Sequence, residues 1–378
     1  MKKHINLIIL SLLILLGCSK QEGCTDINAC NYDEKADSEN GTCIFPEQNY
    51  DCTGGCLNDI DNDGVCDENE LFIFSLGEGN FQSSNSSLWY IDNNENVYEA
   101  PNNPLGDTGQ SLYVHENKIF TIINGSGVIH MYNINANGIE FDSIYDTNFS
   151  GPRNMVVYEN KIFITEWYTN QIRVLDLNNQ NQIALIATDG MPENLLEVNG
   201  KIYVTINMNL DWSAGNSVIE IDPTTYTITN NFIVANNPQD IDVQDNNIYI
   251  SSTYYDENWN SFHAMSKIDL NSGDVIIYED NSGLSFGPDI NIINQKLFRV
   301  TSNGTAELNI NNLAVIDEII IDSIGNVYSM DFLNEKFYFG ITDFVGLNNV
   351  IETDFAGNFL NTYNVGVIPG SFAVWNNN

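Results

Sequence analysis

The sequence has few basic residues. Its 13 Lys and Arg residues stand against 51 Asp and Glu residues, which gives a formal net charge of −38 at pH 7. Like-charge repulsion therefore disfavours nucleic acid or an anionic membrane surface as a partner, and a cation or a neutral ligand is easier to accommodate. The simplest role for so many acids is solubility in an exported protein. Because only 17% of the residues are charged and 43% are hydrophobic, the chain should fold around a large core.

Groups for common catalytic chemistry are also scarce. The chain has four His residues, and its seven Cys residues all precede Asp67, which excludes a cysteine nucleophile from the rest of the chain. It contains no HExxH, GxSxG, Walker or Rossmann motif. From Leu71 onward no segment carries a sustained helical period, so we expect strands there.

The N-terminus has the features of an export signal. Residues 1–4 are basic, and Ile5 to Leu16 is an apolar run that is too short to span a membrane as a helix. The run ends in Leu15-Leu16-Gly17-Cys18, which resembles the bacterial lipobox. The resemblance implies that residues 1–17 are a lipoprotein signal peptide and that Cys18 is diacylated. In such lipoproteins an Asp directly after the lipidated Cys typically signals retention in the inner membrane. Position 19 is Ser, so the resemblance also implies a lipid anchor in the outer membrane, and we expect the protein to face the cell exterior. An ordinary signal peptide with an incidental Cys is the alternative.

Residues 18–70 form a cysteine-rich, acidic module. Apart from Cys18 it holds six Cys residues, and an even number of Cys in an exported segment of about 50 residues predicts three disulfides, because so small a core does not fold unaided. The sequence leaves their pairing open. A zinc site is the alternative, but the module has no His and the compartment is oxidising. The predicted disulfide cysteines are Cys24, Cys30, Cys43, Cys52, Cys56 and Cys66.

The end of this module matches a calcium-binding loop. Residues 59–70 fit the pattern D-x-[DN]-x-[DN]-G-x₅-E, in which Gly64 permits a sharp turn. The flanks do not look helical, so the loop resembles the Asp-rich calcium repeats of extracellular spacer modules rather than an EF-hand. We expect one structural Ca²⁺ that stiffens a stalk; a solvated acidic linker is the alternative. The predicted ligands are Asp59, Asp61, Asp63, the carbonyl of Val65, Asp67 and Glu70.

From residue 71 to residue 378 the sequence repeats one pattern of short apolar strands, with a period of about 40 to 49 residues. This spacing is typical of four-stranded blades, and seven of them fit. We therefore predict an all-β protein, a seven-bladed β-propeller preceded by a small disulfide-rich calcium-binding module. The first repeat starts one strand late and the last has one strand to spare, so Phe372–Trp375 should pair with Phe72–Ser75 and close the ring. The aromatics that mark the repeats are Phe74, Phe120, Phe163, Tyr203, Tyr249, Phe298 and Tyr338.

One face of the ring should gather the binding residues. Turns such as Gly151-Pro152-Arg153-Asn154 lead into the innermost strand of a blade and bring polar groups to the axis, and long aromatic loops open on the same face. Exposed aromatics favour a binding surface, although they could instead cover blade edges. Glu166, Glu193, Asp240 and Asp289 are either an axial metal cluster or acceptors for turn backbone. The predicted ligand-binding residues are Phe81, Arg153, Asn154, Trp167, Tyr168, Trp212, Gln239, Asp240, Tyr255 and Trp259.

The repeats resemble the YncE-like family of seven-bladed propellers, and more narrowly its bacterial surface lipoproteins. The resemblance lies in Gly77-Glu78-Gly79-Asn80-Phe81, Gly151-Pro152-Arg153 and Thr165-Glu166-Trp167, and it fades in the last two blades. BtuG-type members capture cobalamin for a TonB-dependent transporter, so the resemblance implies a non-enzymatic protein that hands such a nutrient to an outer-membrane transporter. Two other functions stay open: a propeller hydrolase or lyase that uses axial carboxylates and a metal, and an adhesion or scaffold protein.

The calcium loop gives a first testable prediction. Calorimetric titration of residues 19–75 should show one Ca²⁺ bound with a dissociation constant no weaker than about 10⁻³ M, the weak end of extracellular sites. Melting of the propeller should barely change on metal removal, because its core lies elsewhere. Absence of any heat at millimolar calcium would exclude the site.

Overall fold

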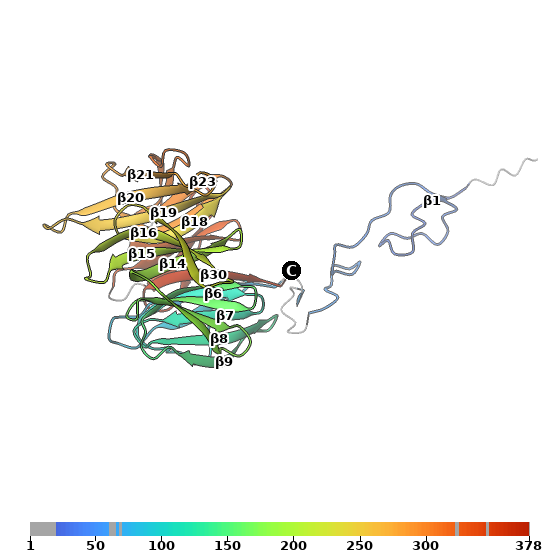
Figure 1. Cartoon of the computed structure of the whole chain (residues 1–378). Coiled ribbons are helices and arrows are strands. Elements are labelled where there is room, and N and C mark those ends of the chain that lie inside the picture. The colour runs from blue at the N-terminus through green and yellow to red at the C-terminus, as the bar shows by residue number, and fades with distance from the viewer. Residues whose placement is uncertain (1–19, 60–65, 68–69, 322–324, 345–347, 378) are drawn as a thin grey trace, which may run out of the picture. The chain divides into compact units, whose positions relative to one another are not determined.

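Every regular element in the described residues is a β-strand, as the sequence predicts (Figure 1). In the computed structural model these residues are 20–59, 66–67, 70–321, 325–344 and 348–377. The chain divides into two units, Met1–Glu68 and Asn69–Asn378. Within the described ranges there is no helix that is long and apolar enough to cross a membrane. The predicted signal peptide and lipidation site Cys18 lie outside them.

In its described residues the N-terminal unit has little regular structure and is cross-linked by disulfides. Its strands β1 (Glu22–Gly23) and β2 (Ser38–Glu39) form a two-stranded parallel sheet. The three predicted disulfides are present, with the pairing Cys24–Cys43, Cys30–Cys52 and Cys56–Cys66. Because all six cysteines are oxidised, they do not provide thiolates for zinc.

The predicted calcium loop is only partly within the described residues. Asp59, Asp67 and Glu70 are described, and the Asp67 and Glu70 side chains are buried. Asp61, Asp63 and Val65 lie outside the described ranges. Calcium binding therefore stays a prediction.

The second unit is a seven-bladed β-propeller, as predicted. Across its described residues, seven four-stranded antiparallel sheets each run from an innermost to an outermost strand. The innermost strands β6, β10, β14, β18, β22, β26 and β30 neighbour one another around the axis. The blades are β6 (Gly109–His115), β7 (Lys118–Ile123), β8 (Val128–Asn135), β9 (Gly138–Asp146); β10 (Pro152–Tyr158), β11 (Lys161–Glu166), β12 (Gln171–Asp176), β13 (Gln182–Ala187); β14 (Gly190–Val198), β15 (Lys201–Asn209), β16 (Ala214–Asp222), β17 (Thr227–Ile233); β18 (Pro238–Gln244), β19 (Asn247–Tyr255), β20 (Ser261–Asp269), β21 (Val275–Glu279); β22 (Phe286–Ile293), β23 (Lys296–Thr301), β24 (Gly304–Leu308), β25 (Val315–Ile320); β26 (Asn326–Leu333), β27 (Lys336–Thr342), β28 (Asn348–Thr353), β29 (Phe359–Asn364); and β30 (Pro369–Asn376), β3 (Leu71–Gly77), β4 (Ser87–Ile91), β5 (Val97–Glu99).

The hydrophobic core lies between blades rather than at the axis. Phe163 on the second strand of one blade packs with Leu195 and Val204 of the next, and equivalent clusters recur around the ring. Neighbouring blades cover both faces of the second strand of a blade, so its sequence is a continuous apolar run. In β11, for example, five of the six residues are buried. The seven aromatics that mark the repeats are all at most 5% exposed.

The two ends of the propeller close the ring as predicted. Strand β30, at the C-terminus, is the innermost strand of the blade that β3 begins, and Phe72, Phe74 and Ser75 pair with Trp375, Ala373 and Phe372. The Phe72 and Trp375 rings stack with centroids 5.4 Å apart. Closure places all seven innermost strands around one axis, which is where the candidate site lies.

Deletion of residues 371–378 should therefore open the ring. Phe372 and Trp375 are 6% and 3% exposed, and truncation of one buried Phe or Trp alone costs about 3–5 kcal/mol, so the loss of stability should exceed that figure. The measurement is the thermal melting temperature, with deletion of residues 377–378 as the control because it leaves β30 intact. Equal melting temperatures for the long deletion and the parent chain would contradict the ring order.

Candidate functional site

A hydrogen-bonded ring joins the innermost strands of all seven blades. On each strand the residue at one equivalent position bonds to the next blade. Four of these residues donate: Ser111 Oγ to the Arg153 carbonyl (2.8 Å), Asn154 Nδ2 to Asn194 Oδ1 (2.6 Å), Asn194 Nδ2 to Asp240 Oδ1 (2.6 Å) and Ser329 Oγ to the Pro369 carbonyl (2.7 Å). Three accept from backbone N–H groups: Asp240 from Ile290 (2.9 Å), Asp289 from Met330 (2.7 Å) and Ser371 from Leu112 (3.1 Å). We call Ser111, Asn154, Asn194, Asp240, Asp289, Ser329 and Ser371 the axial ring.

The four carboxylates that the sequence offered as a metal cluster have other partners in the structure, and Glu193 pairs with Arg153. Asp240 and Asp289 are members of the ring and accept backbone N–H groups, which is the alternative role that the sequence allowed. Glu166 is fully buried elsewhere in its blade, where Arg173 Nε donates to its Oε1 at 2.5 Å. In the described part of the chain, the one group of close potential metal ligands is Cys24, Glu39 and Cys43, and both of those cysteines are in a disulfide.

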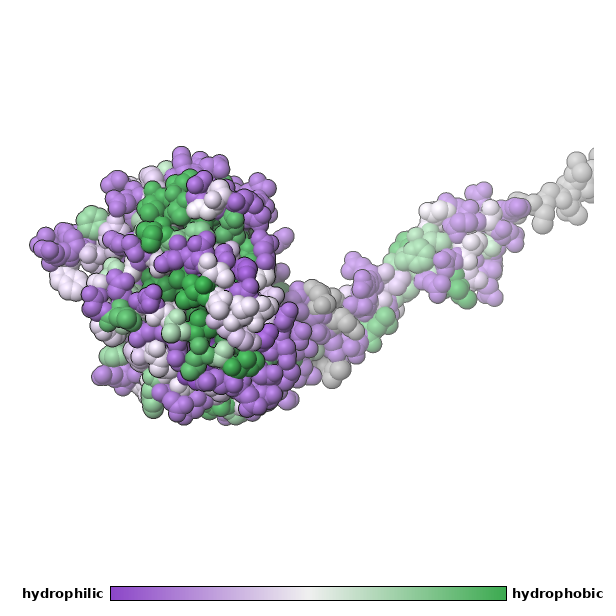
Figure 2. Space-filling view, viewed as in Figure 1, coloured by the Kyte–Doolittle hydropathy of each residue, from purple (hydrophilic) through white to green (hydrophobic). Residues whose placement is uncertain are grey.

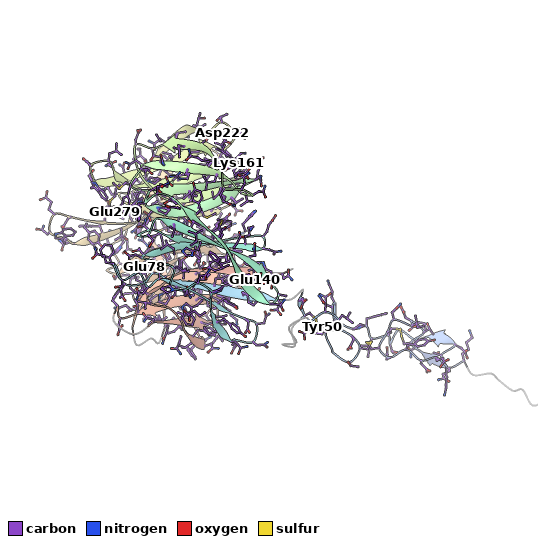
Figure 3. The ribbon with its side chains drawn as sticks, turned by 90° about the horizontal axis from the view of Figure 1, so that it is seen from below. Tyr50, Glu78, Glu140, Lys161, Asp222 and Glu279 are labelled. Carbon is purple, nitrogen blue, oxygen red and sulfur yellow. A yellow bond between two sulfur atoms is a disulfide. The ribbon has the colours of Figure 1, made fainter. Side chains whose placement is uncertain are left out.

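The axial ring surrounds a cavity that opens on one face of the propeller. Its volume is about 950 Å³, and residues from the innermost strands of every blade line it. Glu78, one of the lining residues, lies on the opposite side of the propeller from the hairpin residues Glu140, Lys161 and Asp222 (Figure 3). We call this space the axial cavity.

Arg153 is held rigidly in the wall of the axial cavity. Its Nε donates to both carboxylate oxygens of Glu193 (3.0 and 3.1 Å), and its Nη2 donates to Glu193 Oε1 at 2.5 Å. Its Nη1 donates to Gln110 Oε1 at 2.6 Å, and the guanidinium lies 4.1 Å from the centroid of the Trp167 ring. Three blades thus contribute the ion pair, the hydrogen bond and the cation–π contact that fix the guanidinium.

The opposite wall is rich in buried carboxyl groups. Burial, reinforced by like-charged neighbours, raises the pKa of Asp240 to about 7 and that of Asp331 to about 6. Burial also raises the pKa of Asp289 well above its ordinary value, with the Asp240 charge adding to the effect. Burial raises the pKa of Glu78 too, although the hydrogen bond that Tyr328 donates to its carboxylate acts in the other direction. Near neutral pH this wall therefore holds carboxyl groups that can donate as well as accept hydrogen bonds.

The structure brings together some of the predicted ligand-binding residues and not others. Those that line the axial cavity are Arg153, Asn154, Trp167, Gln239, Asp240 and Tyr255. The remaining four, Phe81, Tyr168, Trp212 and Trp259, are 78%, 58%, 59% and 82% exposed and lie outside it. Figure 2 likewise shows hydrophobic residues exposed in several separate patches among hydrophilic ones on the face that is turned to the viewer.

Other lining residues were missed as binding candidates. Glu78 and Gln110 lie in stretches that carry the family resemblance, but nothing in their local sequence says that they reach the axis. Tyr328 and Asp331 lie on β26, before which the Pro turn of the earlier blades is lost, whereas Asn291 lies on β22, where Pro288 keeps that turn. Gln110 and Tyr328 precede an axial-ring residue by one position and Asn291 and Asp331 follow one by two, so counting from the axial-ring positions would have found these four but not Glu78.

Comparisons with known proteins agree with the fold. The sequence matches no protein-family model and no curated protein. Among solved structures, a functionally unknown protein from Desulfotomaculum acetoxidans is similar with a TM-score of 0.58 and 9% identity, over 80% of this chain and 98% of that one. A catalytically inactive virginiamycin B lyase from Staphylococcus aureus with quinupristin has a TM-score of 0.54 and 16% identity over 71% and 96%. Apo AztD from Citrobacter koseri has a TM-score of 0.52 and 9% identity over 81% and 98%. These similarities establish the fold alone.

The raised pKa of Asp240 predicts how stability depends on pH. The folded state keeps this proton up to about pH 7, whereas the unfolded chain loses it near the ordinary value of 3.8. The stabilising contribution is therefore complete below that value and is lost as pH rises through about 7. Between pH 5 and pH 8 the free energy of unfolding in urea should fall more steeply for the parent than for Asp240→Asn, by at most about 1.4 kcal/mol per pH unit.

Asp222→Asn is the matched control for this experiment. The hydrogen bond from Lys201 and those from Thr224 lower the pKa of Asp222, so its carboxylate stays ionised in both states across this pH range. Its replacement should leave the slope unchanged. Equal slopes for the parent and Asp240→Asn would show that Asp240 is not a buried protonated acid.

Proposed function

We propose that this protein captures a large nutrient, a corrinoid such as cobalamin, in the axial cavity without converting it chemically. The observation that carries the proposal is the axial cavity itself. Its volume of about 950 Å³ lies at the upper end of ligand sites, and an aromatic residue, Trp167, lies beside fixed polar groups in its wall. A flat apolar ring gains contact area against Trp167 and Tyr255, while the polar groups set its orientation.

The polar lining suits the edge of a corrinoid. Carboxamide groups project from the rim of that macrocycle, and each of them offers both a hydrogen-bond donor and an acceptor. The axial cavity presents the amides of Gln110, Asn154 and Gln239 together with carboxyl groups that both donate and accept. Such a lining can satisfy many amide groups at once, which a purely apolar pocket cannot do.

The proposal includes a location and a partner. Cys18, diacylated after signal cleavage, would anchor the protein in the outer membrane with the propeller at the cell exterior, and the N-terminal module with its calcium loop would act as a stalk. A TonB-dependent outer-membrane transporter would accept the ligand. The support is the lipobox-like sequence that ends at Cys18, the three disulfides typical of exported proteins and the resemblance to surface lipoproteins.

A hydrolase or lyase is the second candidate, and one observation favours it. Carboxyl groups with raised pKa values in a cavity, such as Asp240 and Asp289, are typical of general acids. Both, however, already serve the axial ring by accepting backbone N–H groups from the next blade. Their environment is explained by this structural role, so capture remains the function that the geometry favours.

Direct titration tests the proposed function. The Cys18→Ala variant of the full chain, which should be released from the membrane in soluble form, is titrated with cobalamin, cobinamide, haem and a panel of siderophores. Trp167→Ala should weaken binding of the corrinoids by about thirtyfold, or roughly 2 kcal/mol, because it removes the aromatic wall. Trp212→Ala is the matched control and should change nothing, since Trp212 is 59% exposed and outside the axial cavity.

Three results would contradict the proposal. If Cys18→Ala stays in the membrane fraction, the lipid anchor is wrong. If both Trp variants lose affinity equally, the ligand binds on the aromatic rim. If no ligand binds and the protein turns over a glycan or lactone in a reaction that Glu193→Gln abolishes, the protein is an enzyme.

A further inference from the structure

The acidic and basic side chains that line the axial cavity are unequal in number. Six acidic side chains, Glu78, Glu193, Asp240, Asp242, Asp289 and Asp331, face one basic side chain, Arg153. That guanidinium already forms a close ion pair with Glu193 on two of its nitrogens and gives a third to Gln110. An anionic ligand would therefore compete with a bidentate partner for the single cation among the described lining residues.

A second buried cation near this wall is also committed. Arg299 is 1% exposed and does not line the axial cavity. It donates to the carbonyls of Gly287 (2.9 Å), Ala264 (2.8 Å) and Ser252 (3.0 Å) and to Thr253 Oγ1 (3.0 Å). Because Arg299 lies behind the wall and its N–H groups already donate to acceptors in two blades, it cannot bind a carboxylate or phosphate.

Three polar atoms in the wall lack hydrogen-bond partners among the described residues. They are Trp167 Nε1, which donates, and Gln239 Oε1 and Asn291 Oδ1, which accept. The Asn291 amide nitrogen donates to Asp331 Oδ1 at 2.9 Å, and the amide oxygen is a buried acceptor without a partner among the described residues. Buried polar atoms without partners are costly, and because protein covers all three, a bound molecule gives them partners only if these side chains turn toward the axial cavity.

From these observations we infer that the axial cavity selects an uncharged or cationic ligand through carboxamide or similar donor–acceptor groups, and that it rejects the corresponding carboxylates. Glu193 is the residue that sets this selectivity, because it neutralises Arg153. The inference deepens the proposed capture of a large nutrient and rests on it. Above about pH 7, where Asp240 and Asp331 are ionised, a carboxylate without a cationic partner would meet like charge in this wall in addition to the cost of its desolvation.

The first test uses two forms of one corrinoid, with its peripheral carboxamides intact or hydrolysed to carboxylates. The full chain with Cys18→Ala should bind the amide form more tightly by about tenfold or more. Glu193→Gln should narrow this ratio, since Arg153 then becomes available to a carboxylate. Equal or tighter binding of the carboxylate form by the parent would overturn the inference while leaving corrinoid capture intact.

The second test does not depend on the natural ligand. The test is made in a Trp212→Phe/Trp259→Phe variant. The Trp167 signal is the fluorescence that is lost when Trp167→Phe is added to that variant, and its quenching by acrylamide, caesium and iodide is measured. At pH 8, above the raised pKa values of Asp240 and Asp331, the ratio of iodide to acrylamide quenching at Trp167 should fall below that of free N-acetyltryptophanamide, because the ionised wall repels the anion. Glu193→Gln should raise it.

The two tests separate the claims. Failure of both corrinoid forms to bind would contradict the proposed function, and the quenching experiment would then decide the inference by itself. Iodide quenching of Trp167 as efficient as in the free indole compound would overturn the inference whatever the corrinoids do.

Discussion

The axial ring is the constraint on which the rest of the propeller depends. Each blade offers one side chain to the next, and because the last blade meets the first through Ser371 and the Leu112 N–H group, the set of bonds closes only if both chain ends lie in one sheet. The ring fixes the spacing of the innermost strands and hence the width of the axial cavity. It also explains why buried acids are tolerated at the axis: Asp240 and Asp289 receive backbone N–H groups that would otherwise be unsatisfied.

The axial ring and the Arg153–Glu193 pair also determine which charged groups a ligand in the axial cavity can contact. Many acidic side chains of the described residues are exposed to solvent, whereas at the axis Arg153 neutralises Glu193 in a close ion pair. Since that pair lies against Trp167, the polar and aromatic parts of the cavity wall are held as one unit. Such a preorganised wall favours binding, because little side-chain freedom remains to be lost when a ligand arrives.

The fold could be predicted from the sequence further than the site could. A repeat built around buried aromatics such as Phe163 reveals blades, and the spare strand at Phe372–Trp375 reveals their closure, because both follow from strand periodicity. The site depends on which side chains converge across blades, and no local pattern records that. Trp167 and Trp212 look alike as loop aromatics, yet Trp167 lines the cavity while Trp212 faces solvent.

The central claim is that ligand binds inside the axial ring rather than on the aromatic rim. A crystal structure of the chain with a bound corrinoid tests this most directly. It should show the ligand against Trp167, hydrogen-bonded to Gln239 and Asn291, with the axial-ring bonds intact. A ligand seated on Trp259 above an unoccupied cavity would contradict the claim.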